Sequence, residues 1–350
     1  MHMRRTLVPV IDTPPLPPAL GSIVHTLQGK TMGTSWSVKL VADAARDLQT
    51  LQALVQDQLD SVVAQMSTWE TDSDLSRYNQ AAAGSWHHLP DEFFCVLEYA
   101  LDVAQASNGA YDPTAGALVN AWGFGPTRRY NEKGFVAPTS TALDFARAQC
   151  GWQRVQLDKT THRVLQPGNA YIDLSAIAKG FSVDQIARAL LQRGIDSFLI
   201  EVGGELRGTG VKPDGQPWWV ALEHPVSTSF AAANASDHAS ESTIATIAAL
   251  YNLSVATSGD YRRYFENGDT RFSHTIDPRS GAPIVHGLAS VTVLHRDCMA
   301  ADAWSTALGV MGAEQGLKYA EQHNLAALFI QRGKEGFEEH LSKSMTTLLQ

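Results

Sequence analysis

The stretch Arg271–Gly312 reads RFSHTIDPRSGAPIVHGLASVTVLHRDCMAADAWSTALGVMG, and the rest of the chain is interpreted around it. It contains a His-x-x-Asp-Pro turn at His274–Pro278, followed by an apolar strand and a helix that carries Asp302 and Thr306. Residues four apart on a helix share a face, with Cβ atoms about 5–6 Å apart. A carboxylate and a hydroxyl so placed suit Mg²⁺, which takes few protein oxygens and leaves room for phosphates. The alternative is that Asp302 only complements the helix dipole and that Thr306 is solvated or core-facing.

The whole chain has the composition of a soluble globular protein. Of its residues, 44% are hydrophobic and 18% are charged. A length of 350 residues is enough for one large domain or two ordinary ones, and in either case for a full hydrophobic core. The formal net charge of −9 disfavours a nucleic-acid-binding protein, because such proteins present a basic face. No apolar run approaches the ~20 residues of a membrane span. We therefore expect no nucleic-acid partner and no membrane-spanning segment.

The cysteines and the N-terminal segment bear on the compartment. Cys95, Cys150 and Cys298 form no metal-binding or redox motif, so we interpret them as core thiols. Residues 1–21 hold five of the fifteen prolines, which predicts an extended or disordered arm. This arm has no uninterrupted apolar region and no cleavage site of the kind that marks a leader peptide. On these residues we predict a cytoplasmic protein.

Local patterns predict hairpins and helices in an irregular order. Hairpins are predicted over 23–41, 154–166 and 261–276, and helices over 47–66, 91–107, 139–150 and 176–193, with a further helix that ends at Gly312. A strand over 170–174 leads to Ser175, the predicted N-cap of the 176–193 helix. Residues 226–249 are rich in Ala and Ser and indicate a surface insertion. The order of elements favours an α+β fold over a doubly wound sheet.

Two other places have unusual residues. Lys179 falls in the first turn of a predicted helix, where the dipole disfavours a cation, and an anion bound there would resolve the conflict. Residues 109–126 contain four glycines around Trp122 and Phe124, which indicates a backbone that closely approaches a ligand. A plain packed loop is the alternative explanation of these glycines.

Taken together, eight segments resemble those of the ApbE family, the FAD:protein FMN transferases. In chain order they are MGTSWSV, MSTWETDSDLSRYN, YDPTAGALVNAWGFGP, YIDLSAIAKGFSVD, EVGGELRGTG, ATSGDYRRYF, SHTIDPRSGAPI and MAADAWSTALGVMG. The resemblance implies one domain over 22–350 with an ApbE-like, T-fold-like α+β arrangement of mixed β-sheets and packed helices. It also implies an enzyme that cleaves FAD with Mg²⁺ and joins FMN by a phosphoester to a threonine or serine of an acceptor flavoprotein, with release of AMP.

The resemblance also implies a set of site residues. The expected metal ligands are Asp302, Thr306 and the backbone carbonyl of Ala176. The residues expected around FAD are Met32, Ser67, Thr68, Trp69, Asp112, Lys179, Gly203, Gly204, Ser258 and Ile276. The expected catalytic residues are Asp302 and His274. Because histidine titrates near neutral pH, His274 is suited to accept the proton of the attacking hydroxyl; the alternative is a histidine that only caps its hairpin.

Other functions and another compartment stay open on the sequence. An FAD pyrophosphatase, which gives free FMN and AMP, needs the same metal and phosphate groups, with water in place of the acceptor hydroxyl. A non-catalytic flavin-binding protein is expected to have lost the metal pair, and Asp302 and Thr306 are both present. Members of the family usually begin with a lipoprotein leader. If such a leader precedes these residues, a periplasmic protein anchored to the inner membrane is the alternative.

Overall fold

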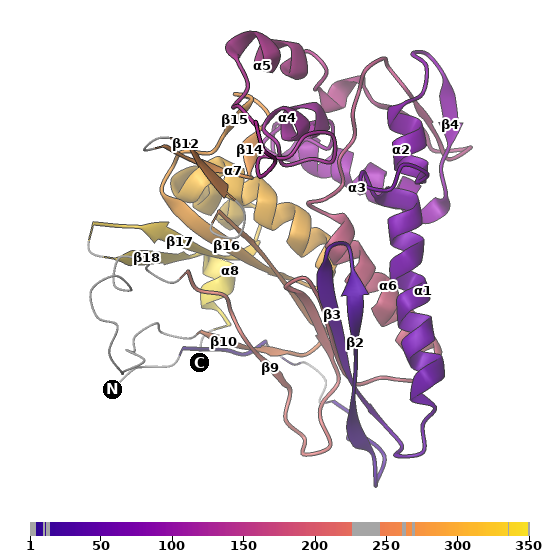
Figure 1. Cartoon of the computed structure of the whole chain (residues 1–350). Helices are drawn as coiled ribbons and strands as arrows, with labels where there is room; N and C mark the ends of the chain where they lie inside the picture. The colour runs from indigo at the N-terminus through magenta and orange to yellow at the C-terminus, as the bar shows by residue number, and fades with distance from the viewer. Residues whose placement is uncertain are drawn as a thin grey trace.

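An antiparallel sheet of eight strands forms the centre of the molecule, shown as a computed structural model in Figure 1. Residues 5–9, 11, 15–225, 246–260, 264–267, 270–334 and 336–348 are described. In spatial order the strands are β18 (Phe337–Leu341), β17 (Ala326–Arg332), β16 (Leu288–His295), β11 (Leu253–Gly259), β8 (Glu205–Thr209), β7 (Phe198–Val202), β3 (Thr34–Ala42) and β2 (Ile23–Thr31). This one sheet takes strands from both ends of the chain. The predicted α+β fold is confirmed.

Alternating side chains put a different core on each face of this sheet. On β17, Ala327 and Phe329 pack toward α7, whereas Leu328 and Ile330 pack toward the opposite face. The predicted hairpin over 23–41 shows the same period, because Trp36, Val38 and Leu40 are all buried. Its turn places Met32 and Gly33 at positive φ.

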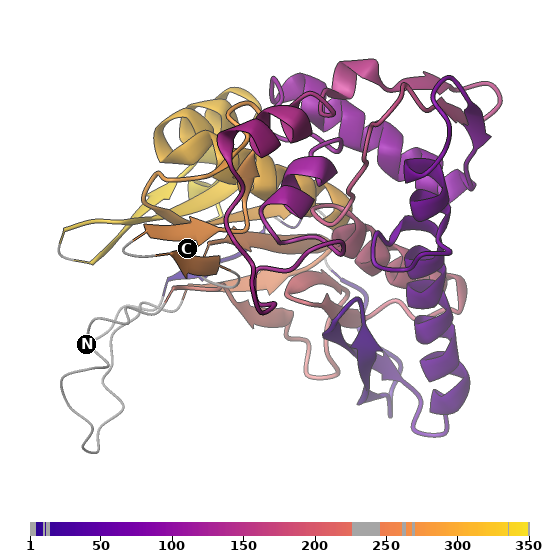
Figure 2. The ribbon, with the colours of Figure 1, turned by 45° about the horizontal axis from the view of Figure 1, so that its top comes forward.

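Three long helices cover one face of the sheet, as Figures 1 and 2 show. They are α1 (Leu48–Met66), α6 (Ala178–Gln192) and α7 (Cys298–Gln322). The remaining helices are α2 (Asp74–Asn79), α3 (Asp91–Ala106), α4 (Gly116–Ala121), α5 (Ser140–Arg147), α8 (Lys343–Thr346) and the 3-10 turn η1 (Trp152–Arg154). Helix α1 buries a stripe at helical spacing that includes Leu51, Val55 and Leu59, and the Asp47 side chain caps its first turn.

Helices α6 and α7 approach each other at Gly180. A Cβ at this position would lie 2.3 Å from the Cys298 carbonyl oxygen and 2.8 Å from Asp302 Cβ, so only glycine permits the contact. Farther along α6, the Asp184 carboxylate accepts hydrogen bonds from the backbone N–H groups of Cys298 (3.1 Å) and Met299 (2.9 Å). Because Asp184 also accepts from Arg207, a buried ion pair caps the start of α7.

The predicted start of α6 was wrong, whereas the helix that carries Asp302 stops at Gly312 as predicted. Asp173 accepts hydrogen bonds from both the N–H and the hydroxyl of Ser175, so Ser175 closes a turn instead of capping the helix, and α6 begins at Ala178. In place of the strand predicted over 170–174, Tyr171 makes a single β-bridge to Ala115. Gly312 (φ 79°, ψ 172°) is non-helical and ends the first segment of α7, and a second helical segment, not predicted, follows to Gln322.

A small sheet packs on the opposite face together with α8. Its strands are β1 (Thr6–Leu7), β10 (Ile247–Leu250) and β9 (Trp218–Ala221). Leu7, in the segment predicted to be an extended or disordered arm, is 1% exposed and joins this core. Most of the insertion predicted over 226–249 lies outside the described residues, and its last residues belong to β10.

Shorter strands complete the fold. They are β4 (Trp86–His88), β6 (Arg163–Leu165) and β5 (Gln156–Asp158), and the hairpins β12 (Tyr264–Asn267) with β13 (Thr270–Ser273) and β14 (Ile276–Asp277) with β15 (Ala282–Pro283). The turn that joins β12 to β13 lies outside the described residues. In the part of the chain that the structure describes, every helix is too short or too polar to cross a membrane.

We predict that Gly180→Ala destabilises the fold, by roughly 1–3 kcal/mol, because the added methyl overlaps the α7 backbone. Gly309→Ala, in α7, is the matched control, since a Cβ there meets no atom within 4 Å. Alanine is also the better helix former by ~1 kcal/mol. Denaturant unfolding of both variants measures the difference. Equal stabilities would show that the close contact between α6 and α7 is not required.

A second prediction concerns the charged cluster around Glu339, where Arg5 Nη1 lies 2.5 Å and His224 Nε2 3.5 Å from its carboxylate oxygens. The hydrogen bond between His224 and Glu339 raises the pKa of the imidazole above 6.5 and is the main cause that lowers the pKa of the carboxyl. The stabilisation by His224⁺ is complete below its unfolded-state pKa and is lost as pH rises through the folded-state pKa. Glu339 contributes above its own unfolded-state pKa, so the pair stabilises most in mildly acidic solution.

We therefore expect the free energy of unfolding to fall across the range that starts at the ordinary pKa of histidine, about 6.5, and runs through its raised pKa in the folded protein, and to fall less in Glu339→Gln. Chemical denaturation across this range measures both slopes. Parallel curves for the two proteins would contradict the assignment.

Candidate active site

Lys179 lies between two buried carboxylates at the start of α6. Its Nζ is 2.8 Å from Glu205 Oε1 and 3.7 Å from Asp302 Oδ2. Glu205 is 2% exposed and Asp302 is 3% exposed. The conflict between Lys179 and the helix dipole is thus relieved by acidic side chains of the protein itself.

Asp302 accepts a hydrogen bond that would be internal to α6 if that helix began one turn earlier. The Gly180 N–H donates to Asp302 Oδ2 at 3.0 Å, whereas in a helix that began earlier it would donate to the Ala176 carbonyl. Among the described residues, no N–H or O–H donates to that carbonyl. The Asp302 carboxylate is therefore brought to the turn that presents an unused backbone oxygen.

Thr306 lies one helical turn after Asp302 and is held from β11. The Ser258 hydroxyl is 2.9 Å from Thr306 Oγ1 and 2.8 Å from Ser305 Oγ. Ser305 in turn donates to the Asp302 carbonyl at 2.9 Å. The turn before α6, together with α6, α7 and β11, therefore brings together five of the expected residues: Ala176, Lys179, Ser258, Asp302 and Thr306.

These oxygens fit a hard cation. One carboxylate, one hydroxyl and one backbone carbonyl form a donor set that suits Mg²⁺, which usually takes one or two carboxylates and keeps several waters. Across the described ranges, no group of three or more His, Cys, Asp or Glu side chains is placed to hold a metal. A zinc-type site is thus not seen in this part of the chain.

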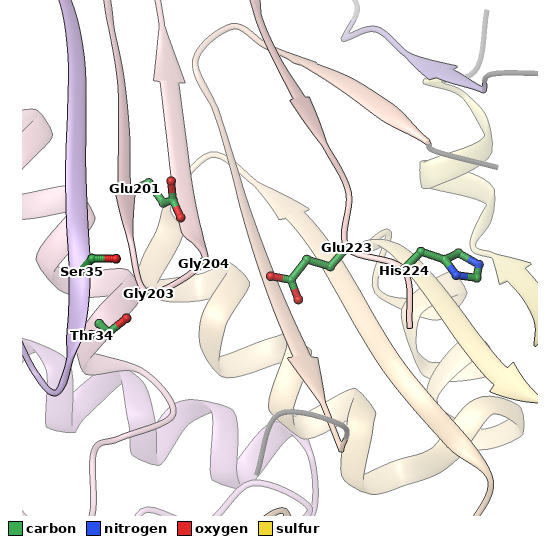
Figure 3. Close-up of a pocket in the computed structure, with 7 residues that line it drawn as sticks. All are labelled: Thr34, Ser35, Glu201, Gly203, Gly204, Glu223 and His224. Atoms are coloured by element: carbon green, nitrogen blue, oxygen red, sulfur yellow. The ribbon is translucent and has the colours of Figure 1, made fainter. Parts of the chain in front are cut away.

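The two hairpin turns next to this centre border open hollows. Gly203 (φ 61°) and Gly204 (φ 102°) form the β7–β8 turn, and the Gly203 N–H donates to the Ser35 carbonyl at 3.1 Å. A hollow of about 440 Å³ is lined by Thr34, Ser35, Glu201, Gly203, Gly204, Glu223 and His224. In Figure 3 the Glu223 side chain points toward the glycine turn, and the His224 ring points away from it. Met32 lines a neighbouring hollow of about 520 Å³.

The predicted residues Ser67, Thr68 and Trp69 form the turn at the end of α1. Ser67 Oγ accepts hydrogen bonds from the N–H groups of Trp69 (3.0 Å) and Glu70 (3.2 Å), which fixes the turn. Thr68 is buried, whereas Trp69 is 45% exposed with the Arg129 guanidinium 4.9 Å above its ring. Trp69 is therefore the member of this turn with an exposed ring.

Asp112 holds a loop together. Its carboxylate accepts from the N–H (2.8 Å) and the hydroxyl (2.7 Å) of Thr114 and from the Trp152 N–H (3.3 Å). Burial raises the pKa of Asp112, and these hydrogen bonds oppose that shift. The described contacts thus give Asp112 a structural role in the glycine-rich segment.

His274 and Ile276 belong to an aromatic and apolar group. The His274 ring meets Phe124 edge-on at 6.2 Å between centroids, and Phe265 stacks on Phe272 at 5.0 Å. Ile276 is buried with Trp122, whose indole N–H donates to the Gly281 carbonyl at 2.9 Å. The glycine-rich loop therefore packs against the two hairpins that flank His274.

Sequence reasoning missed Glu205, Asp184 and Arg207. The register of the β7–β8 hairpin could have found Glu205, because it pairs with buried Val202 and so shares its face. Asp184 follows Gly180 by one helical turn and is likewise buried. Because a charged side chain at a core position needs a buried partner, an acidic residue at such a position of either element is a signal of an ion pair.

Comparison with known proteins gives a consistent result. The sequence model of the ApbE family matches residues 32–329. The FAD:protein FMN transferase of Vibrio cholerae is 38% identical over 327 residues, covering 93% of this chain and 92% of that protein. That of Haemophilus influenzae is also 38% identical, over 336 residues, covering 93% of this chain and 91% of the relative.

Solved structures agree with these matches. The apo form of Pseudomonas stutzeri flavinyl transferase ApbE superposes with a TM-score of 0.82 at 36% identity, covering 93% of this chain and 97% of that one. The flavin transferase ApbE of Vibrio cholerae gives a TM-score of 0.82 at 35% identity, over 94% of this chain and all of that chain. With the family model matched over most of its length, the chain belongs to the ApbE family.

Proposed function

We propose that this chain, a transferase of the ApbE family, moves FMN from FAD to a threonine or serine hydroxyl of an acceptor flavoprotein, with Mg²⁺ and with release of AMP. The hydroxyl oxygen forms a bond to the FMN phosphorus, and the pyrophosphate bond to AMP breaks. The proton of the hydroxyl passes to a base of the enzyme. The predicted cytoplasmic location remains a prediction.

The observation that carries this proposal is the hydrogen bond from Gly180 to Asp302. Within the described ranges, it leaves the Ala176 carbonyl without a donor beside a buried carboxylate. Thr306 extends the donor set along the same face of α7, and Ser258 orients its hydroxyl. Bound by these oxygens, Mg²⁺ would neutralise charge on the pyrophosphate.

The remaining assignments follow from position. The turns at Met32 and at Gly203–Gly204 border open hollows, and Gly204 directly precedes Glu205, which contacts Lys179, so we assign both turns to the nucleotide. Trp69 offers an exposed aromatic face for stacking. We assign Asp112 and Ile276 to support of the loop and hairpin around the flavin, because both side chains are engaged in internal contacts.

We predict one product pattern for the reaction. The protein, FAD and Mg²⁺ should add one FMN by mass to an acceptor domain with a suitable threonine, and release one AMP per acceptor. Asp302→Ala should abolish this addition, because it removes the carboxylate of the donor set. Intact-mass spectrometry of the acceptor and chromatography of the nucleotides measure both products.

The control is an acceptor whose threonine is replaced by alanine, which should stay unmodified. If free FMN accumulates at the same rate with or without an acceptor, the enzyme is an FAD pyrophosphatase and the transferase proposal fails.

We further predict that His274→Ala lowers the transfer rate by a factor of about 10²–10⁴ and changes FAD affinity little, since a base acts in the transition state. Single-turnover transfer and an FAD titration of the same variant separate the two effects. Loss of FAD affinity at an unchanged rate of transfer would make His274 a binding residue instead.

A further inference from the structure

Glu205 and Asp302 share one ammonium group. Lys179 Nζ is nearer to Glu205 Oε1 (2.8 Å) than to Asp302 Oδ2 (3.7 Å). Both carboxylates are nearly inaccessible, and the Lys179 side chain is 29% exposed. In so little water, the distribution of this single positive charge strongly affects both acids.

The backbone fixes the position of Glu205. It is the first residue of β8 and follows the Gly203–Gly204 turn directly, opposite Val202 on β7. A Cβ at Gly203 would lie 2.9 Å from Thr34 Cγ2, so the turn is packed tightly on β3. The Glu205 carboxylate is thus presented by a rigid hairpin to the start of α6.

A divalent cation at Asp302 and the Lys179 ammonium are competitors. Both are positively charged and both are attracted to the same carboxylate, so the presence of one weakens the binding of the other at Asp302. The ammonium can stay near a bound cation only if another anion holds it. Of the two described carboxylates, Glu205 makes the shorter contact with the ammonium and can serve as that anion.

We propose that Glu205 is a positioning residue that holds the Lys179 ammonium and thereby keeps the Asp302 carboxylate available to a divalent cation. This inference rests on the metal site of the proposed function. Glu205 itself is not a metal ligand. Its effect on the cation passes through Lys179.

The test measures metal binding without nucleotide. Mn²⁺ replaces Mg²⁺ as the probe, because it takes the same oxygen ligands and its free form is counted by electron paramagnetic resonance. In Glu205→Gln the ammonium turns to Asp302, and Mn²⁺ should bind on the order of tenfold more weakly than in the wild type. Competition by Mg²⁺ should shift in parallel.

A double-variant cycle tests whether the effect passes through Lys179. Lys179→Met removes the competitor, and Lys179→Met/Glu205→Gln removes both charges, so Glu205 is not left as an unpaired buried carboxylate, while Asp302 keeps its hydrogen bond from the Gly180 N–H. The double variant should bind Mn²⁺ at least as well as the wild type. If it binds as weakly as Glu205→Gln, Glu205 acts on the cation directly and the proposal is overturned.

A matched control excludes a general effect of losing an ion pair. Glu98 makes a contact of 2.6 Å with Lys159 on the surface, and Glu98→Gln should leave the Mn²⁺ affinity unchanged. Unchanged Mn²⁺ affinity in Glu205→Gln would also overturn the proposal. If the wild type and Asp302→Ala show the same weak Mn²⁺ binding, the metal site of the proposed function fails as well. The outcomes named before this one overturn only the role of Glu205.

Discussion

The hydrogen bond from the Gly180 N–H to Asp302 Oδ2 is the contact on which the site depends. It requires α6 and α7 to touch at their backbones, and only glycine at position 180 leaves room for this. It gives a buried carboxylate the partner that burial demands. It also diverts a donor from the Ala176 carbonyl, so one bond both stabilises the helix pair and frees a backbone oxygen that we propose as a metal ligand.

Charge pairing maintains the same helix pair. Asp184 caps α7 with a carboxylate supplied by α6, and Arg207 on β8 compensates its charge. Lys179 and Glu205 repeat this link between α6 and β8 closer to the site. Breaking one member of such a pair leaves an uncompensated buried charge, so the elements that carry the donor set are fixed relative to each other.

Patterns that lie within one element could be predicted from the sequence. The apolar stripe of α1 and the alternation along the 23–41 hairpin depend on neighbours a few residues apart, and both were confirmed. The start of α6 was not predictable in this way, because Asp173 competes for the Ser175 hydroxyl. Glu205 and Asp184 were missed because their partners come from distant segments. Asp112 could be picked out from its sequence motif. Its contacts to Thr114 and Trp152, which show that the side chain holds the loop together, could not be predicted from that motif.

Lys179 illustrates how such a long-range contact changes a functional argument. From the helix alone, a lysine in the first turn indicates an anion-binding position. In the folded protein, Glu205 and Asp302 already surround it, and these three groups together carry a net charge of −1 (one positive, two negative). A pyrophosphate, itself an anion, is repelled by such a group. In the proposed function a divalent cation would reverse the sign to +1, so among these groups the metal, and not the lysine, would supply the attraction for the phosphates.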